Sequence, residues 1–333
     1  MATTSLSVSL QATQPRPLAW LWPGRMAAGR LTLIDGDPGQ GKSLLAIDIA
    51  ARLTSGREMP DGFRPEAPAA VVLLSGEDGM EDTVLPRLLA AGGDVRRTYR
   101  WHEEAGPLVL PQACAALGQM LRDTAARLVI FDPFFAFLGQ EVSSLNDLMI
   151  RRALAPLMGV AEETQASLLL IRHLGKDESK QAAYRGLGSI AILGVARTAF
   201  LVGPDPVDPK LHVLACMKSN LAAMPPSLGF RIVSAGDGRP RLEWQGEVPR
   251  TADDLVAPVR RRGEAVPRAV CFLQERLAAG FCNRQVVLEE AARLGISFRT
   301  LERAKQELWV VSRQRREEGR NVWYWGLREC ELG

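Results

Sequence analysis

The sequence has no long apolar run and no closely paired cysteines. Its 333 residues contain five scattered cysteines. This odd count in a chain of this length argues against a disulfide framework and a zinc site. No apolar stretch approaches the roughly 20 residues that a membrane-spanning helix needs. The first residues lack the basic segment and apolar core of a secretory signal, so we expect residues 1–16 to form a flexible tail and the protein to be cytoplasmic, with no membrane partner.

The chain also lacks a strong overall charge, but its charge is unevenly distributed. The whole sequence has a net charge of +3, whereas residues 250–333 alone contain 16 Lys and Arg against 12 Asp and Glu, a net charge of +4. The excess positive charge therefore lies in the C-terminal part. Such an asymmetry indicates an acidic partner, for example nucleic acid.

The segment GDPGQGKS matches the phosphate-binding pattern G-x-x-x-x-G-K-[ST]. An apolar run at 31–34 precedes it, and the following LLAIDIAARLTSG predicts a helix that ends at Gly56. A glycine loop between a strand and a helix places backbone N–H groups and a helix N-terminus around phosphate. The alternative, a glycine-rich turn with an exposed lysine, does not require this strand and helix. We expect Lys42 to reach the β- and γ-phosphates of ATP and Ser43 to bind Mg²⁺. The predicted nucleotide-binding residues are Gly36, Asp37, Pro38, Gly39, Gln40, Gly41, Lys42, Ser43 and Leu44.

Two further apolar runs end in carboxylates. RLVIFDP predicts a strand that ends at Asp132, a candidate second ligand of Mg²⁺. AAVVLLSGED predicts a strand followed by Glu77 and Asp78. Ligands bind at the carboxyl edge of a parallel sheet. Glu77 is therefore our candidate to orient and deprotonate the attacking water, and Asp78 is the alternative. Either residue could instead be a solvent-exposed acid in a turn, without a catalytic role.

A fourth run, SLLLIRHLGK, predicts a strand that ends near His173. A polar residue there can hydrogen-bond the γ-phosphate and respond to hydrolysis, although a lone histidine is often structural. Helical stretches are predicted at 81–91, 112–126 and 145–164. Strands that alternate with helices predict an α/β fold with a central parallel sheet.

Together these motifs resemble a known family. GDPGQGKS, LLSGED, LVIFDP, LIRHLGK, YRGLGSIA and MKSNLAAMPPSLGFRI occur in the order typical of RecA-like hexameric ATPases. The subgroup most similar is the RepA-type replicative helicases of plasmids and other mobile elements, and the resemblance covers residues 17–245. It implies a RecA-like P-loop core and a homo-oligomeric ring, usually a hexamer, with ATP between neighbouring subunits. An arginine finger would come from the next subunit.

The resemblance is incomplete at the arginine finger. Better-known replicative helicases have K-x-R on a late strand, where this chain has Lys218-Ser219-Asn220. The trans-acting candidates are Arg185, Arg197, Lys218 and Arg231. The loop at 175–188 matches the place of the central DNA-contacting loop of RecA-like rings, and Lys176, Lys180 and Arg185 are its candidate contacts to single-stranded DNA. The loop also contains acidic residues, so a solvated surface loop explains it equally well.

The C-terminal part has its own pattern. Residues 246–265 are expected to be a linker because they contain proline, glycine and charges without periodicity. Residues 266–329 predict three helices and a hairpin, the order of a winged helix, with Ser297 as the N-cap of the third helix. The candidate DNA contacts there are Arg299, Arg303, Arg313, Arg315, Arg316 and Arg320. A protein-binding winged helix is the alternative.

Three functions fit these patterns. The first is an ATP-hydrolysing DNA helicase that translocates on single-stranded DNA in replication. The second is a regulatory or recombination ATPase of the RecA, RadA or KaiC kind. The third is a regulator in which a winged helix binds duplex DNA and ATP controls assembly. A nucleotide kinase fits poorly because no segment has the features of an acceptor-binding lid.

Overall fold

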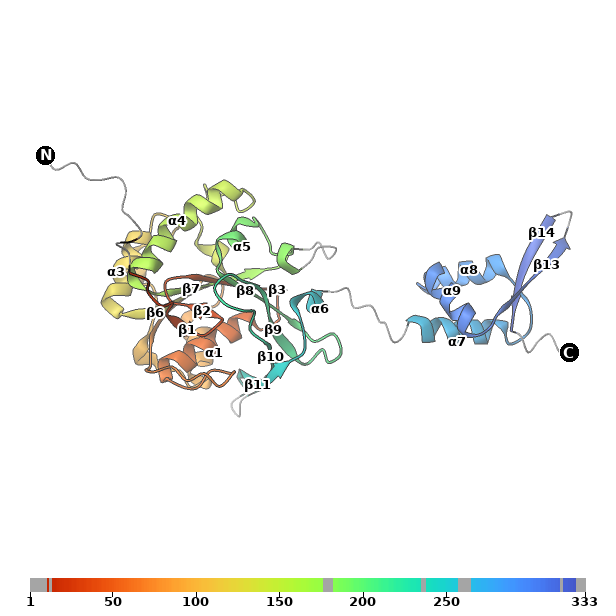
Figure 1. Ribbon diagram of the computed structural model, residues 1–333, viewed down its shortest axis with the longest axis horizontal. Helices are drawn as coiled ribbons and strands as arrows, with labels where there is room; N and C mark the ends of the chain where they lie inside the picture. Colours follow the sequence, from red (N-terminus) through yellow and green to blue (C-terminus); the bar gives the residue numbers. More distant parts are fainter. Residues whose placement is uncertain are drawn as a thin grey trace. The chain divides into compact units, whose positions relative to one another are not determined.

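A computed structural model describes residues 11, 14–175, 182–234, 238–256, 265–317 and 320–327. Lys176 and Lys180, predicted to contact DNA, lie outside these described residues. The chain divides into two compact units, Met1–Pro258 and Val259–Gly333, each drawn in Figure 1. Each unit is described separately.

Within its described residues, the first unit contains a nine-stranded sheet. Its strands are β3 (Leu31–Gly36), β4 (Ala70–Ser75), β5 (Thr98–Tyr99), β6 (Ala126–Asp132), β7 (Ser167–His173), β8 (Thr198–Pro204), β9 (His212–Ser219), β10 (Ser227–Ser234) and β11 (Pro240–Val248). They lie in the order β11-β10-β9-β8-β3-β7-β6-β4-β5. Strands β8, β3, β7, β6, β4 and β5 pair in parallel, and β9, β10 and β11 extend the sheet by antiparallel pairing. The predicted α/β fold with a central parallel sheet is confirmed, and the antiparallel strands β9, β10 and β11 are an addition that the prediction did not include.

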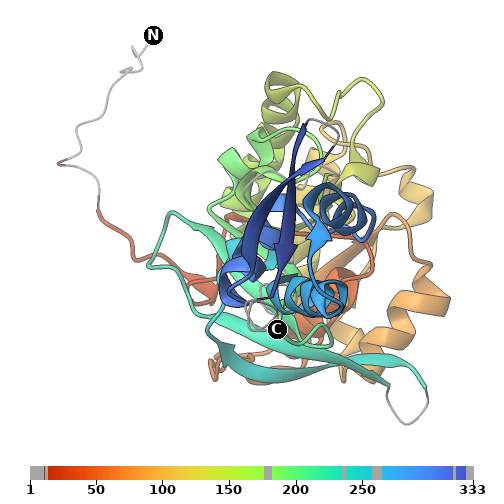
Figure 2. The same cartoon turned by 90° about the vertical axis from the view of Figure 1, so that its right-hand side faces the viewer.

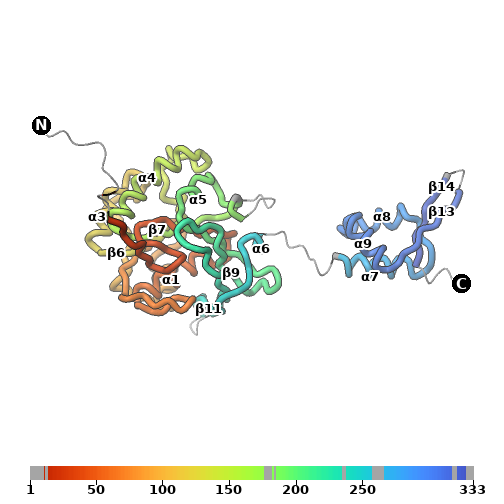
Figure 3. Tube along the Cα trace, viewed as in Figure 1, coloured from red at the N-terminus to blue at the C-terminus, as the bar shows by residue number. Residues whose placement is uncertain are grey.

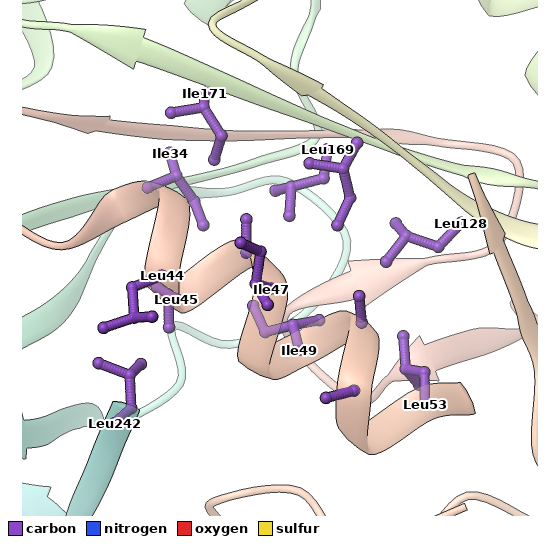
Figure 4. Close-up of a cluster of buried hydrophobic side chains, with 14 of the residues drawn as sticks. Ile34, Leu44, Leu45, Ile47, Ile49, Leu53, Leu128, Leu169, Ile171 and Leu242 are labelled. Atoms are coloured by element: carbon purple, nitrogen blue, oxygen red, sulfur yellow. The ribbon is translucent and has the colours of Figure 1, made fainter. Parts of the chain in front are cut away.

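Helices cover both faces of this sheet because its central strands are apolar on both sides. Helices α1 and α2 pack on one face through a cluster that includes Leu45, Leu53 and Leu88. Figure 4 shows Leu45 and Leu53 of α1 within this cluster. Helices α3, α4 and α5 pack on the other face, through residues such as Leu117 and Leu157. Figure 1 shows α4 and α5 on the side of the sheet opposite α1. The bounds are α1 (Lys42–Ser55), α2 (Leu85–Ala90), α3 (Cys114–Thr124), α4 (Asp147–Thr164) and α5 (Ala191–Val195).

The side chains of one strand alternate between the two clusters. In β3, Ile34 joins the α1 cluster and Leu33 joins the α3–α4 cluster. This alternation fixes the register, since a shift of one residue would exchange the two faces. Before β3, the short strands β1 (Trp20–Trp22) and β2 (Met26–Ala27) form a separate antiparallel pair.

The end of the first unit differs from the expected linker. Residues 246–248 belong to β11, which pairs with β10 along the edge of the sheet (teal in Figure 2). Residues Ala252–Val256 form helix α6, visible after β11 in Figure 3. Ala252 and Val256 are buried against Leu201 and Val213. A five-residue helix is too short to show a periodic pattern, so only its burial identifies it as part of the unit.

The described residues of the second unit form three helices and a small antiparallel sheet. Its core includes Leu273, Val287, Leu301 and Trp325. Ser297 caps the third helix as predicted, since its side chain accepts a hydrogen bond from Thr300 N. The elements are α7 (Ala265–Leu277), β12 (Cys282–Asn283), α8 (Arg284–Arg293), α9 (Phe298–Glu307), β13 (Val311–Glu317) and β14 (Arg320–Gly326). The described part of the chain contains no helix that is long and apolar enough to cross a membrane.

Candidate active site

The polar strand ends meet at one edge of the sheet. Gly36 at the end of β3 pairs with His173 at the end of β7, and Ser75 at the end of β4 pairs with Asp132 at the end of β6. Because these strands are parallel and adjacent, their carboxyl ends share an edge, where open α/β sheets bind ligands. The structure therefore brings together the residues singled out from four separate apolar runs.

The glycine loop leads directly into α1. Gly41 has a φ of 82° and precedes the first helical residue. This left-handed conformation favours glycine, and it lies where the loop passes into the helix N-terminus. The helix ends at Gly56, also left-handed, as the sequence predicted.

Lys42 is held inside this loop. Its side chain is buried, and its Nζ donates to the carbonyl oxygen of Asp37 at 2.8 Å and lies 3.2 Å from Nδ1 of His173. Burial lowers the pKa of Lys42, and the charge of Asp132 is the main opposing influence. The lysine is thus held at the loop by the carbonyl oxygen of Asp37.

Ser43 and Asp132, the predicted ligands of Mg²⁺, lie close together at this edge of the sheet. Both residues line the same small cavity, together with Ser75 and Asp78. Burial raises the pKa of Asp132, whereas a hydrogen bond from Ser43 and the charge of Lys42 lower it. Mg²⁺ prefers oxygen ligands and usually binds one or two carboxylates together with phosphates and water. This pair fits that requirement, and the described residues contain no cluster of three or more His, Cys, Asp or Glu that would hold a metal by itself.

The structure separates the two candidate bases. Asp78 is engaged by Arg87, whose Nη1 lies 2.7 Å from its Oδ2. The Glu77 side chain is 65% exposed, and its Oε1 lies 4.0 Å from Nε2 of His173. A base must be free to reach a water molecule. The geometry favours Glu77 over Asp78 for the predicted role.

His173 connects Lys42 to Glu77. Its Nδ1 faces Lys42 and its Nε2 faces Glu77. Burial lowers the pKa of His173, the Lys42 charge lowers it further, and Glu77 and Asp37 act in the opposite direction. A neutral His173 accepts a hydrogen bond from Lys42, whereas a protonated one would repel it.

This environment predicts a pH dependence of stability. In the unfolded chain, histidine titrates near pH 6.5, so below about pH 6.5 the unfolded state binds a proton that the folded state resists. The contribution of His173 to folding is therefore complete above that pH and is lost as the pH falls. We expect the unfolding free energy, measured with urea at about pH 7.5 and about pH 5.5, to fall less in His173→Gln than in the unaltered protein. An equal fall in both proteins would contradict this assignment.

A buried ion pair beneath the loop was not anticipated from the sequence. Arg172 donates from Nε and Nη2 to the two carboxylate oxygens of Asp35 at 2.8 and 2.6 Å. Both side chains are almost fully buried, and the two residues are direct neighbours on β7 and β3. Burial raises the pKa of Asp35, and the bonds from Arg172 act against that shift. The sequence does contain a signal for this pair, because Asp35 lies just before Gly36 at the end of one apolar run and Arg172 lies just before His173 at the end of another.

The four trans-acting candidates lie in different surroundings. Lys218 donates to the carbonyl oxygens of Leu193 and Gly194 at the end of α5, at 2.7 and 3.2 Å. The remaining three are Arg197, exposed just before β8, Arg231, paired with Asp208, and Arg185, buried near Asp37. Lys218 and Arg231 thus have partners within the chain, and the identity of an arginine finger stays a prediction.

The basic residues of the second unit are mostly at its surface. Arg299 and Arg303 are exposed on α9, while Leu301 and Ala304 of the same helix are buried. The Arg313 guanidinium lies over the Phe281 ring. The exposed candidates on the hairpin are Arg313, Arg315 and Arg316 on β13, and Arg320 begins β14.

Comparison with known proteins identifies the family of this chain. The AAA_25 family model, described as an AAA domain, matches residues 1–179, which is more than half of the chain. The chain belongs to this AAA domain family, and the protein is a P-loop ATPase. No curated protein matches it. One solved structure, an ATPase domain, is similar over 64% of this chain and 84% of that chain, with 12% identity and a TM-score of 0.48.

Proposed function

We propose that the protein is a RecA-like ATPase that hydrolyses ATP with Mg²⁺ and uses the energy to move along single-stranded DNA, as a RepA-type replicative helicase does. The observation that carries the hydrolytic part is the convergence of Lys42, the Ser43–Asp132 pair, Glu77 and His173 at one edge of the sheet. These are the cation, metal ligands, base and polar contact that phosphoryl transfer to water needs.

Each residue has a defined task in this proposal. Lys42 holds negative charge on the β- and γ-phosphates, and Mg²⁺ at Ser43 and Asp132 neutralises the charge that develops there. Glu77 orients the attacking water and accepts its proton. His173 lies between Lys42 and Glu77, and in this proposal it contacts the γ-phosphate of ATP.

The DNA part rests on different features. The family resemblance supports a homo-oligomeric ring in which the segment after His173 contacts DNA at the centre. The basic surface of the second unit, with Arg299 and Arg303 on α9 and arginines on β13, supports binding to phosphates. The order of three helices and a hairpin supports a winged helix.

A second function is favoured by the same basic surface. If the second unit binds one duplex sequence, ATP binding would control assembly at that site, and no translocation would follow. This regulator and the recombination-type ATPase share the hydrolytic site with the helicase. They differ in which DNA accelerates hydrolysis.

The hydrolytic proposal is tested by Lys42→Ala. We expect kcat/KM for ATP to fall about 10²–10³-fold, because a buried, pre-positioned donor is lost. Steady-state phosphate release is the measurement. Lys210→Ala is the matched control because Lys210 is exposed in the turn between β8 and β9. Equal rates in the two variants would refute the proposal.

A further inference from the structure

Arg185 is attached to the candidate active site through its backbone. Its carbonyl oxygen accepts a hydrogen bond from Gly175 N at 2.5 Å. Two residues later, Leu187 N donates to the carbonyl oxygen of His173 at 2.8 Å. The segment that contains Arg185 therefore lies against the carboxyl end of β7, where His173 faces Lys42.

A second attachment holds the same segment from below. Arg172 donates from Nη1 to the carbonyl oxygens of Leu187 and Ser189 at 3.4 and 3.2 Å, while its other nitrogens bind Asp35. Gly186 permits this approach, because a Cβ there would collide with the guanidinium of Arg172. The backbone on both sides of Arg185 is therefore fixed relative to the phosphate-binding loop.

The Arg185 side chain is turned inward. It is only 8% exposed, and its Nη2 lies 3.9 Å from Oδ1 of Asp37, beyond hydrogen-bond distance. Its Nε is buried and has no hydrogen-bond partner among the residues that the structure describes. A buried donor without an acceptor is costly and rare, and a bound ion or ligand can supply the missing acceptor.

Two cations therefore converge on one residue of the phosphate-binding loop. Lys42 contacts the carbonyl oxygen of Asp37, and Arg185 approaches the carboxylate of the same residue. The Asp37 side chain is half exposed and lies beyond hydrogen-bond distance, so it neutralises the buried guanidinium of Arg185 only in part. Two cationic side chains at one point of the loop suit a phosphate group.

We propose that Arg185 is a second phosphate-binding cation of the nucleotide site, that it acts within its own subunit, and that its ligand is the terminal phosphate of ATP. The inference rests on the proposed ATPase function. It replaces the two roles that the sequence suggested for Arg185. A buried side chain beside the loop of its own chain is not placed to enter a neighbouring subunit, nor to grip a DNA strand.

The first test is nucleotide affinity in the full-length protein. Arg185→Ala is expected to weaken binding of a fluorescent ATP analogue about 10- to 100-fold, the loss of one charged hydrogen bond, and to change binding of the matching ADP analogue less than about twofold. Arg185→Lys, which keeps the charge, is expected to recover part of the loss and guards against a folding defect in the alanine variant. Arg127→Ala, an exposed arginine at the start of β6, is the control with unchanged binding.

The second test separates action within a subunit from action between subunits. Arg185→Ala and Lys42→Ala proteins are mixed, and phosphate release is measured. A trans-acting arginine would restore activity in mixed assemblies, because some sites would combine two intact halves. We expect no recovery.

The outcomes distinguish a failure of the role proposed for Arg185 from a failure of the proposed ATPase function. Recovery in the mixture, equal losses for the ATP and ADP analogues, or no loss for either would overturn the role of Arg185. If Lys42→Ala binds both analogues normally, the proposed ATPase function itself fails. If Lys42→Ala loses binding and Arg185→Ala does not, only the inference about Arg185 is wrong.

Discussion

Glu77→Gln is expected to lower kcat for ATP hydrolysis about 10²–10⁴-fold and to leave ATP binding nearly unchanged. The amide keeps the shape of the side chain but cannot accept the proton of the attacking water. Glu77 is exposed, and its carboxylate lies 4.0 Å from His173. No hydrogen bond or ion pair among the described residues joins it to Ser43 or Asp132, so the substitution breaks no contact with these residues. Single-turnover hydrolysis measured beside equilibrium ATP binding separates the two effects.

Asp78→Asn provides the matched control for this experiment. Asp78 follows Glu77 directly, but its carboxylate is bound by Arg87 at 2.7 Å. We expect this variant to retain most of the hydrolysis rate. The opposite result, an active Glu77→Gln and an inactive Asp78→Asn, would transfer the role of base to Asp78.

The second large effect concerns stability. Arg172→Ala is expected to lower the free energy of unfolding of the first unit by about 3–5 kcal/mol, because it leaves the Asp35 carboxylate buried without its partner. Asp35 and Arg172 are 0% and 1% exposed and share two hydrogen bonds. Urea unfolding, followed by tryptophan fluorescence, measures the loss.

The control for this prediction removes both charges. In the double variant Asp35→Leu with Arg172→Met, no charge remains buried, so we expect much of the stability to return. A single variant that costs less than about 1 kcal/mol, or a double variant that is less stable than Arg172→Ala, would show that the pair is not a coupled buried unit.

The strands and the edge they share were predictable because each apolar run ends in a recognisable polar group. The runs before Gly36, Asp132 and His173 became β3, β6 and β7, and parallel pairing placed their ends together. Local patterns carry this information, since a buried parallel strand is apolar throughout and its ligand-binding edge is polar.

Contacts between distant residues were not predictable in this way. Asp35 and Arg172 are 137 residues apart, and only the sheet register makes them neighbours. Arg185 follows a stretch rich in charged residues, so the sequence suggested a surface loop, whereas the backbone bonds to Gly175 and from Leu187 to His173 turn its side chain inward. The roles of the individual site residues remain predictions that the variants above test.

The most direct measurement is the steady-state rate of ATP hydrolysis with and without single-stranded DNA, with duplex DNA for comparison. Translocation on single-stranded DNA requires strong stimulation by single strands, and we expect this stimulation to be absent in Lys42→Ala and Glu77→Gln. Hydrolysis that no single strand accelerates, together with tight binding of one duplex by the second unit, would contradict translocation and leave the ATP-controlled regulator.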